Sequence, residues 1–204
     1  MLENDPFDKT IGNCAPCGCP CNADSPGRRT ALKTIAGVAL AGVGLSPTHA
    51  AEDSPRAGDW LVLADNESKT ALRSEDLRVG EKQVIAYAFD PSSKTLRDSS
   101  RLNRIVLVKL DTSAMDDATR PLAAEGVLAY SAFCTHQGCD VSSWLVKEQV
   151  LLCFCHFSKF APLQGGVVLE GPAPRALPAL PLKVDGGRLV VAAGFTSEPG
   201  KAAA

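Results

Sequence analysis

The sequence predicts a mainly β protein in which antiparallel strands form a small sandwich or barrel. After Ala51 the chain alternates short apolar runs, rich in β-branched residues, with breaks of Gly, Pro, Asp and Ser, a pattern typical of strands joined by turns. No run in that part of the chain shows the apolar period of a long helix. The triplet Asp185-Gly186-Gly187, between two such runs, is a strong signal for a β-hairpin. Short strands closed by regular turns favour an antiparallel sandwich or barrel.

Seven runs carry the strand signal, and most of them are bounded by turn residues. They are residues 60–63, 83–89, 105–110, 127–131, 149–152, 182–184 and 188–192. Residues 112–125 are the segment best suited to a short helix, with a surface excursion as the alternative. We therefore expect one β domain over residues 52–196, followed by a flexible tail at 197–204.

Length and charge narrow the function. The chain has 204 residues, enough for one globular domain with an appended segment. Its net charge is −2 at pH 7, which predicts neither a nucleic-acid partner nor strong attraction to anionic lipid. The sequence shows no catalytic triad, phosphate-binding loop or carboxylate pair.

Residues 1–51 have the pattern of an export signal or membrane anchor. Arg28-Arg29 forms a twin-arginine pattern, and residues 34–45 follow as an apolar run of about twelve residues. A bilayer span needs roughly 20 apolar residues, so a signal-peptide core is favoured, and residues 48–50 offer small side chains near a cleavage point. A buried helix is disfavoured because Pro47 and a charged, proline-containing stretch follow. We expect the periplasm, or the periplasmic face of the cytoplasmic membrane if the signal is kept as an anchor.

Four of the eight cysteines lie ahead of this signal, at Cys14, Cys17, Cys19 and Cys21. In another context such a cluster would suggest a metal site. Here two interpretations stay open: incidental cysteines in the region before the signal core, or a transient metal or redox role before export.

The other four cysteines and two of the three histidines fall between residues 134 and 158. As donors they read Cys134-x-His136, followed by Cys153-x-x-His156. Alternate residues of an extended loop face the same side, so Cys134 and His136 can face one metal centre. A tight turn lets Cys153 and His156 do the same. Two thiolates with two imidazoles are the ligand set of the Rieske-type [2Fe–2S] centre, although structural zinc accepts the same donors.

These loops resemble those of the Rieske iron–sulfur proteins of cytochrome bc complexes, which read Cys-Thr-His-x-Gly-Cys and Cys-x-Cys-His-x-Ser. The likeness spans approximately residues 126–193, whereas residues 52–125 resemble that family only as a β-rich pattern. Gly171-Pro-Ala-Pro174 looks like the proline segment that covers the cluster there. The resemblance implies an antiparallel β Rieske fold whose small subdomain, at about residues 130–178, binds one [2Fe–2S] cluster. It also implies the ligands, which are Cys134 and Cys153 on one iron and His136 and His156 on the other.

The neighbouring positions refine this expectation. Cys139 and Cys155 are left over, and in an exported protein we expect them to form a disulfide. By resemblance, Ser158 donates a hydrogen bond to a bridging sulfide, which raises the reduction potential. Phe160 stands where high-potential members carry a tyrosine that bonds a ligand sulfur, so we expect a lower potential. Gln137 is polar where quinol-oxidising complexes have an apolar residue that helps to form the quinone-docking tip.

Residues 129–139 and 155–160 are more similar to the small Rieske subunit of arsenite oxidase, a family with twin-arginine export. This resemblance implies an electron-transfer subunit that links a molybdopterin-type large subunit to a cytochrome c, a cupredoxin or a quinone. Such a subunit is expected to have no substrate turnover alone. A Rieske subunit of a quinol-oxidising complex, with cytochrome b as its partner, is the alternative. A structural zinc-binding β domain is the second alternative. A cytosolic Rieske ferredoxin is disfavoured by the extra cysteine pair and by the export pattern.

Overall fold

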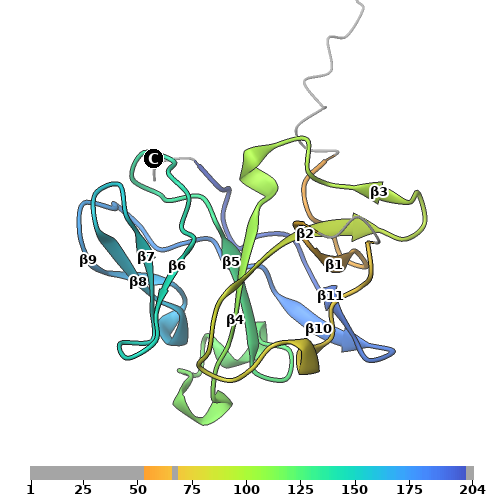
Figure 1. The fold of residues 1–204 in the computed structure, drawn as a ribbon, viewed down its shortest axis with the longest axis horizontal. Coiled ribbons are helices and arrows are strands. Elements are labelled where there is room, and N and C mark those ends of the chain that lie inside the picture. The colour runs from red at the N-terminus through yellow and green to blue at the C-terminus, as the bar shows by residue number, and fades with distance from the viewer. Residues whose placement is uncertain (1–52, 66–68, 201–204) are drawn as a thin grey trace, which may run out of the picture. The chain divides into compact units, whose positions relative to one another are not determined.

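The computed structural model describes residues 53–65 and 69–200, which form two antiparallel β-sheets (Figure 1). Short 3-10 turns lie in the connections between strands of the same sheet. Within these ranges there is no α-helix. The strands are β1 (Trp60–Leu63), β2 (Val84–Asp90), β3 (Thr95–Leu96), β4 (Ile105–Lys109), β5 (Val127–Ser131), β6 (Ser143–Leu145), β7 (Val150–Cys153), β8 (Ser158–Ala161), β9 (Val167–Glu170), β10 (Leu182–Asp185) and β11 (Arg188–Val191). The 3-10 turns are η1 (Ser74–Asp76), η2 (Arg101–Asn103), η3 (Thr112–Ala114), η4 (Arg120–Leu122) and η5 (Pro162–Gln164).

The larger sheet has the strand order β10-β11-β1-β2-β4-β5, with β3 paired to β2. The β10–β11 hairpin turns through Gly186 and Gly187, whose φ angles of 56° and 76° are both positive. A two-residue turn with positive φ at both positions matches the right-handed twist of the strands, and glycine adopts it without strain. The hairpin expected at residues 185–187 is therefore confirmed.

The smaller sheet has the order β6-β7-β8-β9 and provides the frame for both predicted ligand loops. The first ligand loop, residues 132–142, connects β5 of the larger sheet to β6. The second ligand loop, residues 154–157, connects β7 to β8. Because β7 pairs directly with β8, with Cys153 opposite Ser158, the second loop is a short reversal at the end of a hairpin.

Strands β4 and β5 stand between two hydrophobic cores. Alternate side chains of a strand point to opposite faces, and in β4 the side chains of Val106 and Val108 pack in one core while those of Ile105 and Leu107 pack in the other. The first core also takes residues from the smaller sheet and includes both candidate cysteine ligands. Figure 1 shows β6–β9 on one side of β4 and β5 and the rest of the larger sheet on the other.

The mainly β, antiparallel fold class is confirmed, and each of the seven predicted runs overlaps a strand. The prediction missed β3, β6, β8 and β9. Residues 112–125 contain η3 and η4, so the expected helix is reduced to two single 3-10 turns. Residues 197–200, expected to begin a flexible tail, receive hydrogen bonds from Arg175 at Ser197 Oγ and at Glu198 O.

The predicted twin-arginine signal and Cys14, Cys17, Cys19 and Cys21 lie outside the described residues. In the part of the chain that is described, no helix has the length and apolar character needed to span a membrane.

Candidate metal centre

The first ligand loop is a narrow hairpin held by its own backbone. The Cys134 N–H donates to Cys139 O at 2.8 Å, and the Gly138 N–H donates back to Cys134 O at 2.9 Å. Gly138 has a φ of +75°, and a Cβ on it would lie 2.2 Å from the Phe133 ring. Only glycine fits this position, because the backbone passes directly over the aromatic ring. The Cys-x-His segment is therefore presented by a turn whose shape the glycine fixes.

The second ligand loop is exposed along its whole length, residues 154–157. Phe157 takes a positive φ of 59°, a conformation that costs an L-residue about 1–2 kcal/mol. Phe154 and Phe157 leave 62% and 65% of their surface exposed, one on each side of the Cys155–His156 pair. Two large apolar side chains thus stand in solvent beside a candidate ligand.

The four candidate donors separate into a buried sulfur side and an outer nitrogen side. Cys134 and Cys153 are each 2% exposed and carry free thiols. His156 is exposed and His136 is half-buried. The two Nδ1 atoms lie 3.2 Å apart, with the ring planes nearly perpendicular. Two imidazoles that face one another through nitrogen can bind one metal atom together.

Burial affects the protonation of the Cys134 thiol. Burial raises the pKa of this thiol to about 11; the neighbouring Cys153 thiol adds to the rise, while backbone N–H groups of His136 and Gln137 partly oppose it. At neutral pH the thiolate therefore forms only when a cation displaces its proton, as coordination to a metal does. The buried thiols and the facing imidazoles fit a [2Fe–2S] centre with mixed ligands.

A disulfide between Cys139 and Cys155 joins the two ligand loops in the structure, across 16 residues of sequence. The sulfur atoms of these two residues and of Cys153 lie within 4.8 Å of one another. This trio is not a metal site, because sulfur atoms already bonded in a disulfide are not thiolates. The bond instead links the loop of His136 covalently to the loop of His156.

The proline segment, residues 171–174, packs over Ser158 at the start of β8. The Ser158 side chain is almost fully buried, and its Oγ accepts a hydrogen bond from the Ala173 N–H at 3.2 Å. That bond leaves the hydroxyl proton available to donate, as the predicted bond to a cluster sulfide requires. On the other side, Thr135 Oγ1 donates to Arg175 O at 2.7 Å. The proline segment therefore contacts the residue that directly follows the second ligand loop, and Arg175 after the segment contacts the first loop.

Phe160 is fully buried in the core that also contains Cys134 and Cys153. Its ring carries no hydrogen-bond donor, so the predicted consequence for the potential still stands as a prediction. Tyr130, in the same core, donates its hydroxyl to Pro162 O at 2.7 Å. Gln137 is exposed at the end of the first loop.

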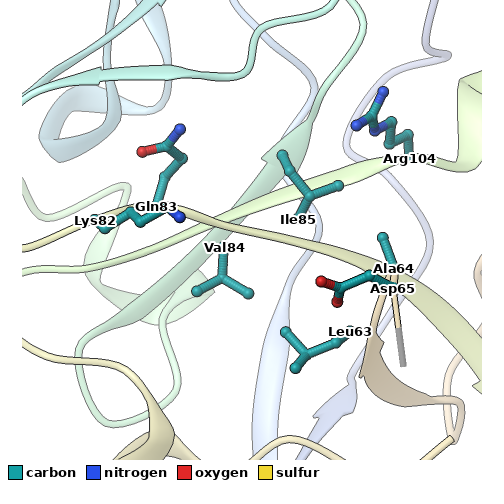
Figure 2. A pocket seen from close by; sticks show the side chains of 8 residues that line it. All are labelled: Leu63, Ala64, Asp65, Lys82, Gln83, Val84, Ile85 and Arg104. Carbon is teal, nitrogen blue, oxygen red and sulfur yellow. The ribbon is translucent and has the colours of Figure 1, made fainter. Parts of the chain in front are cut away.

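A separate pocket of about 380 Å³ lies at the ends of β1 and β2 (Figure 2). Its lining includes Lys82, Gln83 and Arg104 but neither a thiol nor an imidazole. It is therefore distinct from the candidate metal centre.

The structure thus places Cys134 beside Cys153 and His136 beside His156, and their assignment as ligands stays a prediction. Sequence reasoning missed the supporting contacts of Thr135, Gly171 and Arg101. Thr135 lies inside the Cys-Thr-His motif, but the sequence does not indicate that its hydroxyl donates to Arg175 O. The partner of Arg101 lies 37 residues away, and no local pattern marks that contact.

Comparison with known proteins gives one family. A match to the family described as Rieske [2Fe-2S] domain covers residues 71–181. A Haloferax mediterranei protein, whose name assigns it to a respiratory nitrate reductase as the Rieske subunit, is 33% identical over 146 residues, covering 71% of this chain and 62% of that protein. The cytochrome bc1 complex Rieske iron-sulfur subunit of Corynebacterium diphtheriae is 40% identical over 148 residues, covering 68% and 35%.

The cytochrome bc1 complex Rieske iron-sulfur subunit of Streptomyces lividans is 31% identical over 140 residues, which cover 68% of this chain and 82% of that sequence. The chain spans 62% of the length of the Haloferax relative and 35% of the Corynebacterium relative. What those whole proteins do is therefore not carried over directly.

Proposed function

On the premise that the chain belongs to the Rieske [2Fe–2S] domain family, we propose that it is an exported electron-transfer subunit. In this proposal it relays electrons between a larger oxidoreductase partner and a respiratory acceptor. The observation that carries the proposal is the pair of histidines facing each other through Nδ1 at 3.2 Å, outside a pair of buried thiols.

Cys134 and Cys153 would hold one iron of the cluster, and His136 and His156 the other. When bound, such a cluster takes up and returns single electrons at a potential raised by its neutral imidazole ligands. Both cysteines are packed in the hydrophobic core, which would keep water away from the cysteine-bound iron.

The histidine edge is where electrons would enter and leave, because the cysteine side is buried and the second loop is exposed. The Nδ1 atoms face inward toward each other, so Nε2 is the ring nitrogen left to exchange a proton with solvent or with a partner. Phe154 and Phe157 flank this edge with exposed apolar surface. A partner that covers them would exclude water around His156 during electron transfer.

For the partner, the sequence of the ligand loops favours an arsenite-oxidase-like complex with a molybdopterin-type large subunit. The relatives named as subunits of a respiratory nitrate reductase and of cytochrome bc1 complexes support an oxidoreductase complex in general. A quinol-oxidising complex with cytochrome b is the second candidate, favoured by the 40% identity to the Corynebacterium subunit. The exposed, polar Gln137 argues against it, since a quinone-docking tip is apolar. Export and membrane association are proposed on the Arg28-Arg29 pattern and the apolar run after it.

The ligand assignment is tested by the visible and electron paramagnetic resonance spectra of the purified full-length chain. His136→Ala or Cys153→Ser should abolish the Rieske spectrum. The matched controls are His49→Ala and Cys14→Ser, which change the same residue types outside the two ligand motifs of the sequence and should leave the spectrum unchanged. A colourless protein that binds zinc would favour the structural-zinc alternative, and a spectrum that survives either ligand change would refute the assignment.

The partner is tested by purifying the tagged chain from its native membranes. Copurification with a molybdopterin subunit is expected, whereas a stable complex with cytochrome b would favour the second candidate. Electron exchange with the purified partner should occur only in the cluster-loaded chain. Substrate turnover by this chain alone would contradict the proposal.

A further inference from the structure

The 3-10 turn η2 (Arg101–Asn103) of the β3–β4 connection lies against the first ligand loop. Arg101 Nη2 donates to Gly138 O at 3.1 Å and lies 3.4 Å from Asp140 Oδ1. Its guanidinium carbon is 5.5 Å from the centroid of the Phe133 ring, a distance at which cation and aromatic ring attract each other. One arginine therefore contacts the loop at three residues, before and after the Cys134-x-His136 ligand pair.

A second arginine neutralises the carboxylate of this group. Arg104 Nη1 contacts Asp140 Oδ2 at 2.6 Å, and Arg104 O accepts a hydrogen bond from the Ala132 N–H at 2.8 Å. Two guanidinium groups thus share a single carboxylate, which leaves an excess of positive charge. Asp140 pairs more closely with Arg104, at 2.6 Å, than with Arg101, at 3.4 Å, so the charge of Arg101 is the less neutralised of the two.

The backbone that carries Arg101 is itself fixed. Asn103 is buried, and its Nδ2 donates to Asp53 O at 2.9 Å and to Asp53 Oδ2 at 2.8 Å. Ser100 Oγ accepts from the Leu102 N–H at the start of the turn. The position of the arginine therefore comes from the larger sheet and its connections, independently of the disulfide between the two ligand loops.

We propose that Arg101 is a positioning residue for the electron-transfer site: it holds the first ligand loop in its cluster-binding shape and places a fixed positive charge on the Gly138 carbonyl, two residues from His136. The inference rests on the proposed function. A fixed cation near a redox centre stabilises the state that carries the added electron, so it raises the reduction potential. An arginine serves this purpose at any physiological pH, since its guanidinium stays protonated.

The size of the effect on the reduction potential depends on how exposed the Arg101 side chain is. The Arg101 side chain is 69% exposed, so water and salt screen its charge, as they do for exposed ion pairs. On that scale, removal of the charge should lower the equilibrium constant for one-electron reduction by roughly two- to fivefold. For a one-electron couple this corresponds to about 20–40 mV, at 59 mV for each factor of ten.

The test uses Arg101→Gln, which removes the charge, and Arg101→Lys, which keeps it. Arg73→Gln is the control, because Arg73 is also an exposed arginine paired with a neighbouring carboxylate, Glu75. We expect the potential of the holoprotein to fall in Arg101→Gln, to stay near wild type in Arg101→Lys and to be unchanged in Arg73→Gln. The Arg101→Gln difference should shrink in 1 M salt. An unchanged potential in Arg101→Gln, or an equal fall in both Arg101 variants, would overturn the charge role.

The positioning role has its own readout in amide hydrogen exchange of the holoprotein. Exchange in residues 132–141 should quicken in Arg101→Gln, while exchange in residues 153–158 should not change. Equal protection of the first loop in both proteins would overturn the positioning role. If the wild type carries no Rieske cluster, the proposed function fails by itself; if it does and Arg101→Gln matches it in both measurements, only this inference fails.

Discussion

The contact of the proline segment with Ser158 gives the sharpest prediction, through the substitution Gly171→Ala. A Cβ on Gly171 would lie 2.5 Å from Ser158 Cα, 2.8 Å from its N and 2.9 Å from its Oγ. The first two of these atoms belong to the backbone of β8, which cannot rotate away as a side chain can. Either the proline segment or the start of β8 must move, and both lie beside the candidate centre.

The cost has two parts, and a second glycine separates them. Gly171 has a φ of +89°, which in an alanine costs about 1–2 kcal/mol. Overpacking adds about 1–3 kcal/mol, so Gly171→Ala should lose about 2–5 kcal/mol of unfolding free energy. Gly58 has a similar φ of +95°, but a Cβ on it would meet no atom within 4 Å. Gly58→Ala should therefore lose only the conformational part.

Urea unfolding of both variants, followed by circular dichroism and by cluster absorption, measures this difference. The reduction potential is the second assay, since displacement of the Ser158 hydroxyl should lower it in Gly171→Ala and leave it unchanged in Gly58→Ala. Equal losses of stability in the two variants would show that the segment does not press on β8. An unaltered potential in Gly171→Ala would refute the role given to the Ser158 hydroxyl.

Three further changes have defined outcomes. Phe160→Tyr should raise the midpoint potential in protein-film voltammetry by adding a donor near the ligand sulfur, and no rise would remove the role given to the missing hydroxyl. Cys139→Ser removes the disulfide to Cys155, so the cluster should form but be released sooner. The variant should lose about 3 kcal/mol of unfolding free energy, the value for a closed loop of this length. A variant as stable as wild type would contradict a stabilising role for this disulfide. The hydroxyl and backbone N–H of Ser92 hold the pKa of Asp90 below its ordinary value. A carboxyl whose pKa is lower in the folded than in the unfolded chain stabilises the fold above about pH 4, and the stabilisation is lost as the pH falls through the pKa of the folded state. Ser92→Ala should therefore have a lower free energy of unfolding than wild type in urea at pH 6. The two proteins should have the same free energy of unfolding at a pH where Asp90 is protonated.

The ligand loops could be predicted because each is local in sequence. The spacings Cys134-x-His136 and Cys153-x-x-His156 are each visible within four residues of sequence. Each motif can therefore be identified without knowing which distant residues contact it. The strands with clear β-branched runs were found for the same reason.

The missed strands lack such a local signal. β6 has three half-buried residues, and β9 shows mostly exposed positions despite its apolar residues. β8 begins with Ser158, whose burial follows from the proline segment above it rather than from its own polarity. Their strand conformation depends on pairing with β7 and with each other, and this pairing is tertiary information.

The difference between local motifs and tertiary packing also explains the extent of the resemblance. The motifs show it over about residues 126–193, whereas the family match begins at residue 71. The ligands all lie in the later part, but the core beneath them does not. Val106 and Val108 of β4 pack in the core that holds Cys134 and Cys153, and Arg101 reaches the first loop from the turn just before that strand. The centre needs its two ligand loops held in fixed positions and its cysteines buried. The four-stranded sheet alone would leave both of its faces exposed, so a second layer must cover the cysteines. The larger sheet supplies that layer, so its packing against β7 and β8 determines where the thiols lie.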